Sequence, residues 1–270
     1  MDDRLSKFSE ERQLLLDRIV SFLEKDPRIV AAWLFGSLGR AEYDDLSDID
    51  IWIVIADEFI QEISQLRRQF VSQIGVPLLV VEAPQNAPRN GAYLMVYYPS
   101  EIAPLQVDWY WQSQSEAFIP TDTKLLFDRA GLELGTKPVE FTNVNPDPSL
   151  TEGLVHFVSY FWAMLLITTK YAMRDPWSEE MELLPYVMDA FHQTRQYLGL
   201  DISLVRQETL DQKHPKDKLR ILRELAAEMT GMMAALESKG FDMPNQFVPG
   251  LQNYLELFES NMQATTQSKK

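Results

Sequence analysis

The chain has 270 residues, 46% of them hydrophobic, which is enough apolar material for one large domain or two domains of ordinary size. The absence of cysteine excludes disulfides, thiolate metal sites and thiol nucleophiles, and favours a cytoplasmic location. The net charge of −15 argues against nucleic acids as partners, because proteins that bind phosphate backbones usually carry basic surfaces.

Helix and strand patterns alternate through the first half of the chain. Residues 12–24 carry apolar side chains at helical spacing, and residues 57–73 repeat that pattern. Six apolar runs of strand length are separated by Pro, Asn and Gly, at residues 29–35, 51–55, 77–83, 92–98, 105–111 and 125–128. This mixture predicts a mixed-sheet α/β domain.

The second half is predicted to be helical. Residues 153–169 carry no formal charge, but they are slightly too few to span a bilayer, so we expect a helix buried in a bundle and no membrane partner. Long helical patterns cover residues 150–173, 178–198, 215–238 and 246–261. With a Pro-rich linker at residues 143–148, the predicted fold class is α+β: a mixed-sheet domain at residues 1–148, then an all-α helical bundle at 149–270.

The most specific pattern lies between the first two strand-like runs. It reads Gly36-Ser37-Leu38-Gly39-Arg40, followed by Ser47-Asp48-Ile49-Asp50. Asp48 and Asp50 are two residues apart, so on a strand both carboxylates point to the same side and can share a cation. Gly36 and Ser37 offer backbone N–H groups without an obstructing side chain, together with a hydroxyl. The pattern indicates a site for Mg²⁺ and a nucleoside triphosphate.

This order of motifs resembles the nucleotidyltransferase superfamily of DNA polymerase β, whose signature is G-S followed by D-x-D. The spacing and the arginine at the end of the turn, Arg40, are most similar to the aminoglycoside and lincosamide nucleotidyltransferases. The resemblance implies a nucleotidyltransferase domain and a helical bundle with the active site in the cleft between them. It also implies an adenylyl-type transfer that uses two Mg²⁺ ions.

The expected reaction moves AMP from ATP to a hydroxyl of a small molecule, most simply a cationic antibiotic. Residues 1–150 hold 24 acidic against 13 basic side chains, a balance that attracts a polycation. Two alternatives stay open: a nucleotidyltransferase acting on a protein or RNA, and a non-catalytic nucleotide-binding sensor.

The resemblance also implies a third carboxylate, on a later strand, that completes the metal site and often serves as the base. Asp108 matches, since it interrupts the apolar run at residues 105–111. Glu82 and Glu101, at the ends of other strand-like runs, compete for this role, and an edge-strand acid facing solvent is the plainer interpretation of Asp108. The predicted metal ligands are therefore Asp48, Asp50 and Asp108, with Asp108 also the expected base.

Three cations are candidates for nucleotide binding beside Gly36 and Ser37. Arg40 follows the turn and can reach a phosphate, with a surface salt bridge as the alternative. Lys170 and Arg174 are four residues apart, so both can grip the β- and γ-phosphates from one helix face. Related enzymes have a similar helix ending in R-G-E/D-x-W, whereas this chain has Asp175-Pro176 after Arg174. Ordinary stabilisation of a helix C-terminus by cations is the alternative for this pair.

Overall fold

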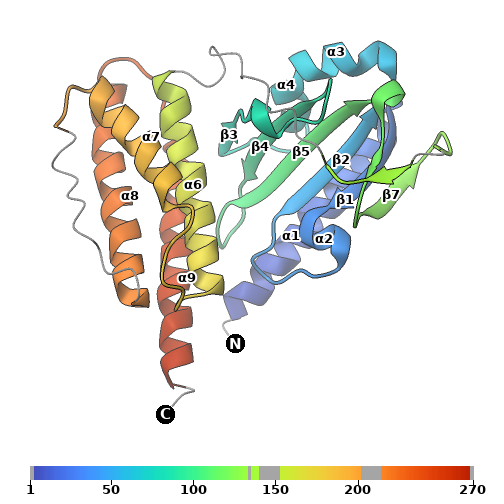
Figure 1. Cartoon of the computed structure of the whole chain (residues 1–270). Coiled ribbons are helices and arrows are strands. Elements are labelled where there is room, and N and C mark those ends of the chain that lie inside the picture. Colours follow the sequence, from blue (N-terminus) through green and yellow to red (C-terminus); the bar gives the residue numbers. More distant parts are fainter. Residues whose placement is uncertain (1–2, 133–134, 140–152, 202–213, 268–270) are drawn as a thin grey trace. The chain divides into compact units, whose positions relative to one another are not determined.

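A computed structural model of the chain describes residues 3–132, 135–139, 153–201 and 214–267 (Figure 1). These residues separate into two compact units. The N-terminal unit comprises residues 5–100 and 104–151, and the helical unit comprises residues 1–4, 101–103 and 152–270. The predicted linker at residues 143–148 lies outside the described residues, so the expected domain boundary stays a prediction.

The N-terminal unit is built on a six-stranded mixed sheet of order β3-β4-β5-β2-β1-β7 (Figure 1). Only β2 and β5 pair in parallel, and the other neighbours in this sheet are antiparallel. The strands are β1 (Ile29–Phe35), β2 (Ile49–Ile55), β3 (Leu79–Val81), β4 (Ala92–Tyr98), β5 (Leu105–Ser113) and β7 (Lys124–Asp128). A separate two-stranded sheet joins β6 (Ile119–Pro120) to β8 (Thr136–Lys137).

Among the described residues, four α-helices accompany the sheet: α1 (Asp3–Lys25), α2 (Gly36–Arg40), α3 (Asp57–Gln65) and α4 (Arg67–Ser72). The predicted helix at residues 57–73 is divided at Leu66, which ends α3 and precedes α4. The segment expected to be a small-residue turn after β1 is the single-turn helix α2. These differences are local, and the predicted α+β fold class is confirmed.

One face of the sheet carries an aromatic cluster that packs against two of the helices. On one face, Trp109 and Trp111 stack with ring centroids 5.8 Å apart, and Phe70 of α4 meets them edge-on at 6.1 and 6.2 Å. Phe22 of α1 packs against Phe70 at 5.1 Å. α1 and α4 therefore cover the face of Trp109 and Trp111. Asp108, one residue away on β5, belongs to the opposite face.

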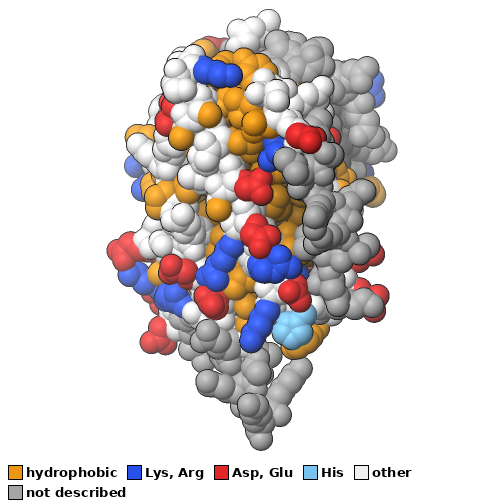
Figure 2. All heavy atoms as spheres, turned by 90° about the vertical axis from the view of Figure 1, so that its left-hand side faces the viewer, with side chains coloured by type: hydrophobic (Ala, Val, Ile, Leu, Met, Phe, Trp, Pro, Cys, Tyr) orange, Lys and Arg blue, Asp and Glu red, His pale blue; other side chains and the backbone are white. Residues whose placement is uncertain are grey.

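The described part of the helical unit contains α6 (Leu154–Arg174), α7 (Leu184–Tyr197), α8 (Pro215–Glu237) and α9 (Phe247–Gln267) (Figure 1). α6 contacts the other three helices and buries Phe161 and Trp162 completely, as expected for the central helix of a bundle. Within the described residues, no helix is both long enough and apolar enough to cross a membrane. Figure 2 shows acidic and basic side chains interspersed over the face that includes α8.

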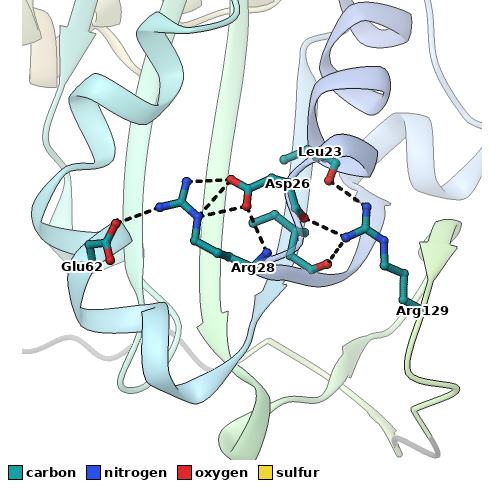
Figure 3. A network of polar contacts seen from close by, with 6 residues as sticks. Leu23, Asp26, Arg28, Glu62 and Arg129 are labelled. Atoms are coloured by element: carbon teal, nitrogen blue, oxygen red, sulfur yellow. Dashed lines mark hydrogen bonds and ion pairs between the residues drawn. The ribbon is translucent and has the colours of Figure 1, made fainter.

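A polar network ties the end of α1 to the start of β1 (Figure 3). The Arg28 guanidinium donates to both carboxylate oxygens of Asp26, at 2.7 and 2.9 Å, and to Oε1 of Glu62 on α3 at 2.9 Å. Arg129, after β7, donates to the carbonyl oxygens of Asp26 at 2.8 Å and Leu23 at 3.4 Å. The network satisfies carbonyl groups that the last turn of a helix leaves without partners.

Asp26 is expected to stabilise the fold in a pH-dependent way. Burial acts to raise the pKa of its carboxyl, but hydrogen bonds from Arg28 outweigh burial and lower this pKa overall. A lowered pKa means stabilisation that is present above the unfolded value of about 3.9 and is lost as pH falls through the folded-state pKa.

We expect Asp26→Asn to reduce the free energy of unfolding by about 1 kcal/mol at pH 7, after allowance for solvent screening. Urea denaturation should show the difference from wild type shrinking at acid pH. Glu62→Gln, at the exposed rim of the network, is the control and should cost less than about 0.5 kcal/mol. A pH-independent loss in Asp26→Asn would contradict the assignment.

Candidate active site

Gly36 brings the start of α2 against Asp50. Its φ of +63° is a left-handed conformation that favours glycine. A Cβ built on Gly36 would lie 2.1 Å from Oδ2 of Asp50, so any side chain would have to displace that carboxylate. Phe35 of β1 pairs with Asp50 of β2, which is how the strands bring these two motifs together. Gly36 is therefore required both by its backbone conformation and by its closeness to a candidate metal ligand.

Asp50 and Asp108 are neighbours across the parallel pair of β2 and β5, where they occupy the same register position. Residues at one register position point to the same face of a sheet. Two acids that lie 58 positions apart in the sequence are thus adjacent in the fold. This placement brings together two of the three carboxylates that the sequence predicted as metal ligands.

Tyr110 lies among all three predicted carboxylates. It is two residues after Asp108 on β5, and its ring stacks on that of Trp52 with centroids 5.2 Å apart. Its hydroxyl forms a hydrogen bond with the side chain of Asp50. Burial, followed by the negative charges of Asp50, Asp108 and Asp48, raises the pKa of Tyr110 well above its usual value. The phenol therefore stays protonated and acts as a donor on this face.

Arg12 anchors the connection that leads to Asp48. This buried guanidinium donates to the carbonyl oxygens of Asp44 at 2.8 Å and Ser47 at 2.9 Å. The side chain of Asp44 in turn accepts from the backbone N–H of Leu46 at 3.0 Å, an Asx-type turn. Asp44 and Arg12 thus shape the backbone immediately before Asp48, which is half-buried next to β2.

Asp108 receives a hydrogen bond on each of its two oxygens. The Tyr93 hydroxyl on β4 donates to Oδ1 at 3.0 Å, and Nε2 of Gln106 donates to Oδ2 at 3.0 Å. Asp108 is 8% exposed, so the plainer expectation of an edge acid facing solvent is wrong. β5 is a central strand of the sheet, between β4 and β2.

The competitors of Asp108 have other surroundings. Glu82 is buried, but its carboxylate pairs with Arg67 at 3.0 Å and Arg68 at 2.9 Å. Glu101 is exposed in the connection between β4 and β5. Neither shares the register position of Asp50, so Asp108 is the carboxylate that the sheet places beside the D-x-D motif.

Two observations fit a nucleotide and its metal at this place. Oγ of Ser37 is buried and has no hydrogen-bond partner among the described residues, and such a group calls for an explanation. Gly36 lets the backbone at the start of α2 lie directly against the carboxylate of Asp50. The described side chains include no group of three or more His, Cys, Asp or Glu placed to hold a metal ion. Mg²⁺ in proteins is usually held by one or two carboxylates together with phosphate oxygens and water, and Asp50 and Asp108 are two carboxylates that adjacent strands bring together here.

The predicted phosphate-binding cations have different surroundings. Arg40 is exposed and pairs with Glu42 at 3.1 Å, which matches its alternative as a surface salt bridge. In the helical unit, Lys170 is 3% exposed and Arg174 is exposed, and both lie against the ring of Tyr171, at 5.8 and 5.5 Å from its centroid. Both residues belong to the last turns of α6.

Lys218 of α8 is a third cation at this end of α6, and the sequence analysis missed it. Its side chain is completely buried, and Nζ reaches the carbonyl oxygen of Asp175 at 3.5 Å. Burial lowers the pKa of Lys218, while the charge of Asp175 acts in the opposite direction. A buried ammonium with one long hydrogen bond is costly unless an anion accompanies it.

Comparison with known families identifies the N-terminal motif region. Residues 17–89 match the model of the family described as "Polymerase beta, Nucleotidyltransferase". The match includes Gly36, Ser37, Asp48 and Asp50, and it ends before Asp108. This part of the chain is thus a polymerase β-like nucleotidyltransferase domain. No curated protein matches the chain.

Two solved structures show a distant likeness. The first, titled "Structure of E. coli MS115-1 CdnC:HORMA-deltaN complex", is 14% identical with a TM-score of 0.30; the match covers 75% of this chain and 62% of that one. The second, "Structure of STING-associated CdnE c-di-GMP synthase from Capnocytophaga granulosa", is 12% identical with a TM-score of 0.30; it covers 96% of this chain and 83% of that one. The chain thus spans less than two thirds of the first structure's chain, and similarity at this level carries no argument about substrate.

Proposed function

We propose that the protein is a nucleotidyltransferase that moves a nucleoside monophosphate, AMP in the simplest case, from its triphosphate to a hydroxyl of a small molecule. The observation that supports this most is the adjacency of Asp50 and Asp108 beside Gly36 on one face of the sheet. Such a transfer needs mainly positioning and charge neutralisation, which carboxylate-bound Mg²⁺ and a phosphate-binding turn supply.

Each residue of the site has a separate role in this proposal. The acceptor oxygen attacks the α-phosphorus, the bond from this phosphorus to the bridging oxygen breaks, and pyrophosphate leaves. Asp108 takes the hydroxyl proton, while Gly36 and Ser37 bind the phosphates. Asp48, Asp50 and Asp108 would hold two Mg²⁺ ions, and the bound ions would supply charge neutralisation for the transfer.

The acidic charge of the chain favours a cationic acceptor. With 24 acidic and 13 basic side chains in residues 1–150, the protein attracts a polycation and repels a nucleic acid. An aminoglycoside, which carries several ammonium groups next to hydroxyls, combines the required charge with the required nucleophile. We therefore propose a cationic antibiotic, an aminoglycoside or a lincosamide, as the acceptor.

The test is pyrophosphate release from each of the four nucleoside triphosphates with Mg²⁺. One series contains aminoglycosides, one lincosamides, one tRNA, and one no acceptor. Release that depends on an aminoglycoside or a lincosamide supports the proposal. Release with tRNA, or from nucleotides alone, would place the reaction in another class. Nucleotide-induced, Mg²⁺-dependent thermal stabilisation without any release would indicate a non-catalytic sensor.

We further propose that the cations at the end of α6 bind the triphosphate. Arg174→Ala is then expected to weaken binding of a non-hydrolysable ATP analogue with Mg²⁺ by roughly 10- to 150-fold, since a hydrogen bond to a charged group contributes about 1.5–3 kcal/mol. Acceptor binding should change little. Calorimetric titration measures both.

Arg223→Ala is the matched control for this prediction. Arg223 is a partly exposed arginine of α8 that pairs with Glu259 at 2.8 Å. Its replacement by alanine removes the same charge from the helical unit as Arg174→Ala does. An unchanged dissociation constant in Arg174→Ala, or an equal change in Arg223→Ala, would mean that Arg174 only completes a helix.

A further inference from the structure

The contacts of Asp108 point to residues whose effect on the reaction is indirect. Its two donors come from different strands, Tyr93 from β4 and Gln106 from β5. The exposed fractions of Tyr93, Gln106 and Asp108 are 3%, 7% and 8%, so water competes little for these bonds. A carboxylate by itself rotates broadly about its last torsion, and one donor on each oxygen fixes the plane of the group.

Tyr93 is held as a hydrogen-bond donor. A side-chain hydrogen bond with Asn86 is a further contact of Tyr93. An ionised carboxylate only accepts hydrogen bonds. The Tyr93 hydroxyl must therefore be the donor in its hydrogen bond with Asp108.

The amide of Gln106 is oriented by the same carboxylate. Its Nε2 faces Asp108, which leaves Oε1 buried and without a hydrogen-bond partner among the described residues. Turning the amide over would place Oε1 against the acceptor-only carboxylate. The side chain thus leaves its own oxygen without a partner in order to donate to Asp108.

We propose that Tyr93 and Gln106 are positioning residues that hold the Asp108 carboxylate in the orientation in which it takes the proton of the acceptor hydroxyl. The inference rests on the proposed nucleotidyl transfer and adds two residues to it. Neither touches substrate in this scheme, because both act through Asp108. Their removal should therefore slow the chemical step and leave nucleotide binding unchanged.

Tyr93→Phe tests this with the loss of one oxygen atom. We expect kcat for pyrophosphate release to fall about 10- to 100-fold, the loss that follows removal of a partner that orients a catalytic ligand. The KM for the nucleotide should stay within about twofold of the wild-type value, because uniform binding is untouched. Gln106→Met, which keeps the length of the side chain and removes the donor, should have the same effect.

Tyr97→Phe is the matched control. Tyr97 lies on the same strand and the same face as Tyr93, it is also buried, and its hydroxyl contacts the sulfur of Met95 at 3.2 Å. Its kcat should stay within about twofold of wild type. Equal losses of kcat in Tyr93→Phe and Tyr97→Phe, or an unchanged kcat in Tyr93→Phe, would overturn the inference.

A double-mutant cycle separates positioning from structural damage. In an Asp108→Asn background, measured with radiolabelled nucleotide over long incubations, Tyr93→Phe should cause no further loss of kcat. The same loss in both backgrounds would overturn the inference.

If wild-type protein releases no pyrophosphate with any acceptor, the proposed function fails and urea denaturation tests the contact itself. Tyr93→Phe should then lower the denaturation midpoint of wild type and leave that of Asp108→Ala unchanged. Equal shifts in both would overturn the coupling of Tyr93 to Asp108.

Discussion

Replacing Asp50 by Asn is expected to reduce pyrophosphate release to background while leaving the fold intact. Loss of a residue that only orients a metal ligand costs about 10- to 100-fold, so loss of a ligand itself should exceed about 100-fold. The change keeps the shape of the side chain, so the close contact with Gly36 is preserved. Asp48→Asn should behave in the same way.

The stability of Asp50→Asn is part of the same prediction. Asp48, Asp50 and Asp108 all place negative charge near Tyr110, and like charges in one site repel when no metal is bound. Neutralising one of them should leave the apo protein as stable as wild type or slightly more stable. Mg²⁺ should then shift the melting temperature of wild type with nucleotide and fail to do so in the variant.

Asp45→Asn is the control, since it removes one charge from the connection before the motif without touching a proposed ligand. It should keep pyrophosphate release near the wild-type rate. If Asp50→Asn released pyrophosphate at the wild-type rate, the assignment of Asp50 as a metal ligand would be wrong. An equal loss in Asp45→Asn would attribute the effect to the charge of the domain and not to a ligand.

The sequence was sufficient for the fold class because the apolar runs are bounded by clear signals. The strands at residues 29–35 and 92–98 have the predicted limits, since Asp26-Pro27 and Gly91 precede them and helix- or turn-forming segments follow. The long apolar pattern of α6 likewise predicted a buried helix, and most of its side chains are buried against α7, α8 and α9. Local periodicity was decisive where one period dominated.

Local geometry was harder to predict. The divided helix at Leu66 has no Pro or Gly to mark it, and α2 follows from a left-handed Gly36 whose conformation no periodicity reveals. The requirement for glycine at position 36 was attributed to phosphate binding. The structure adds the carboxylate of Asp50, which leaves no room for a Cβ.

Some features of the candidate site depend on residues that are close in the sequence, and others depend on residues that are far apart in it. Asp48 and Asp50 are two positions apart in the sequence, with Asp48 just before β2 and Asp50 within it, so their nearness follows from local spacing that the sequence displays. The neighbours of Asp108 depend on strand order and register, which a single sequence does not state. Tyr93 was therefore missed, although Gln106 carried a usable signal as a second polar residue two positions before Asp108 in an apolar strand. Lys218 was missed because a lysine in a helical pattern reads as solvent-exposed.

Asp108→Asn is expected to lower kcat by about 10²–10⁴-fold, the usual contribution of a general base, with a much smaller change in nucleotide affinity. The amide cannot take the proton of the acceptor hydroxyl, but it retains one oxygen that accepts from Tyr93 or Gln106. The protein should therefore fold normally, and a non-hydrolysable ATP analogue should bind with a dissociation constant within a few-fold of the wild-type value.

Glu82→Gln and Glu101→Gln complete this experiment, since both acids competed for the role of base. Glu82 pairs with Arg67 and Arg68, so its loss should lower the urea midpoint and leave kcat nearly unchanged. Glu101 is exposed, and its loss should affect neither quantity. Single-turnover rates with saturating nucleotide separate the chemical step from binding. If either glutamate variant lost more kcat than Asp108→Asn, the base would lie there, and the adjacency of Asp108 to Asp50 would serve metal binding alone.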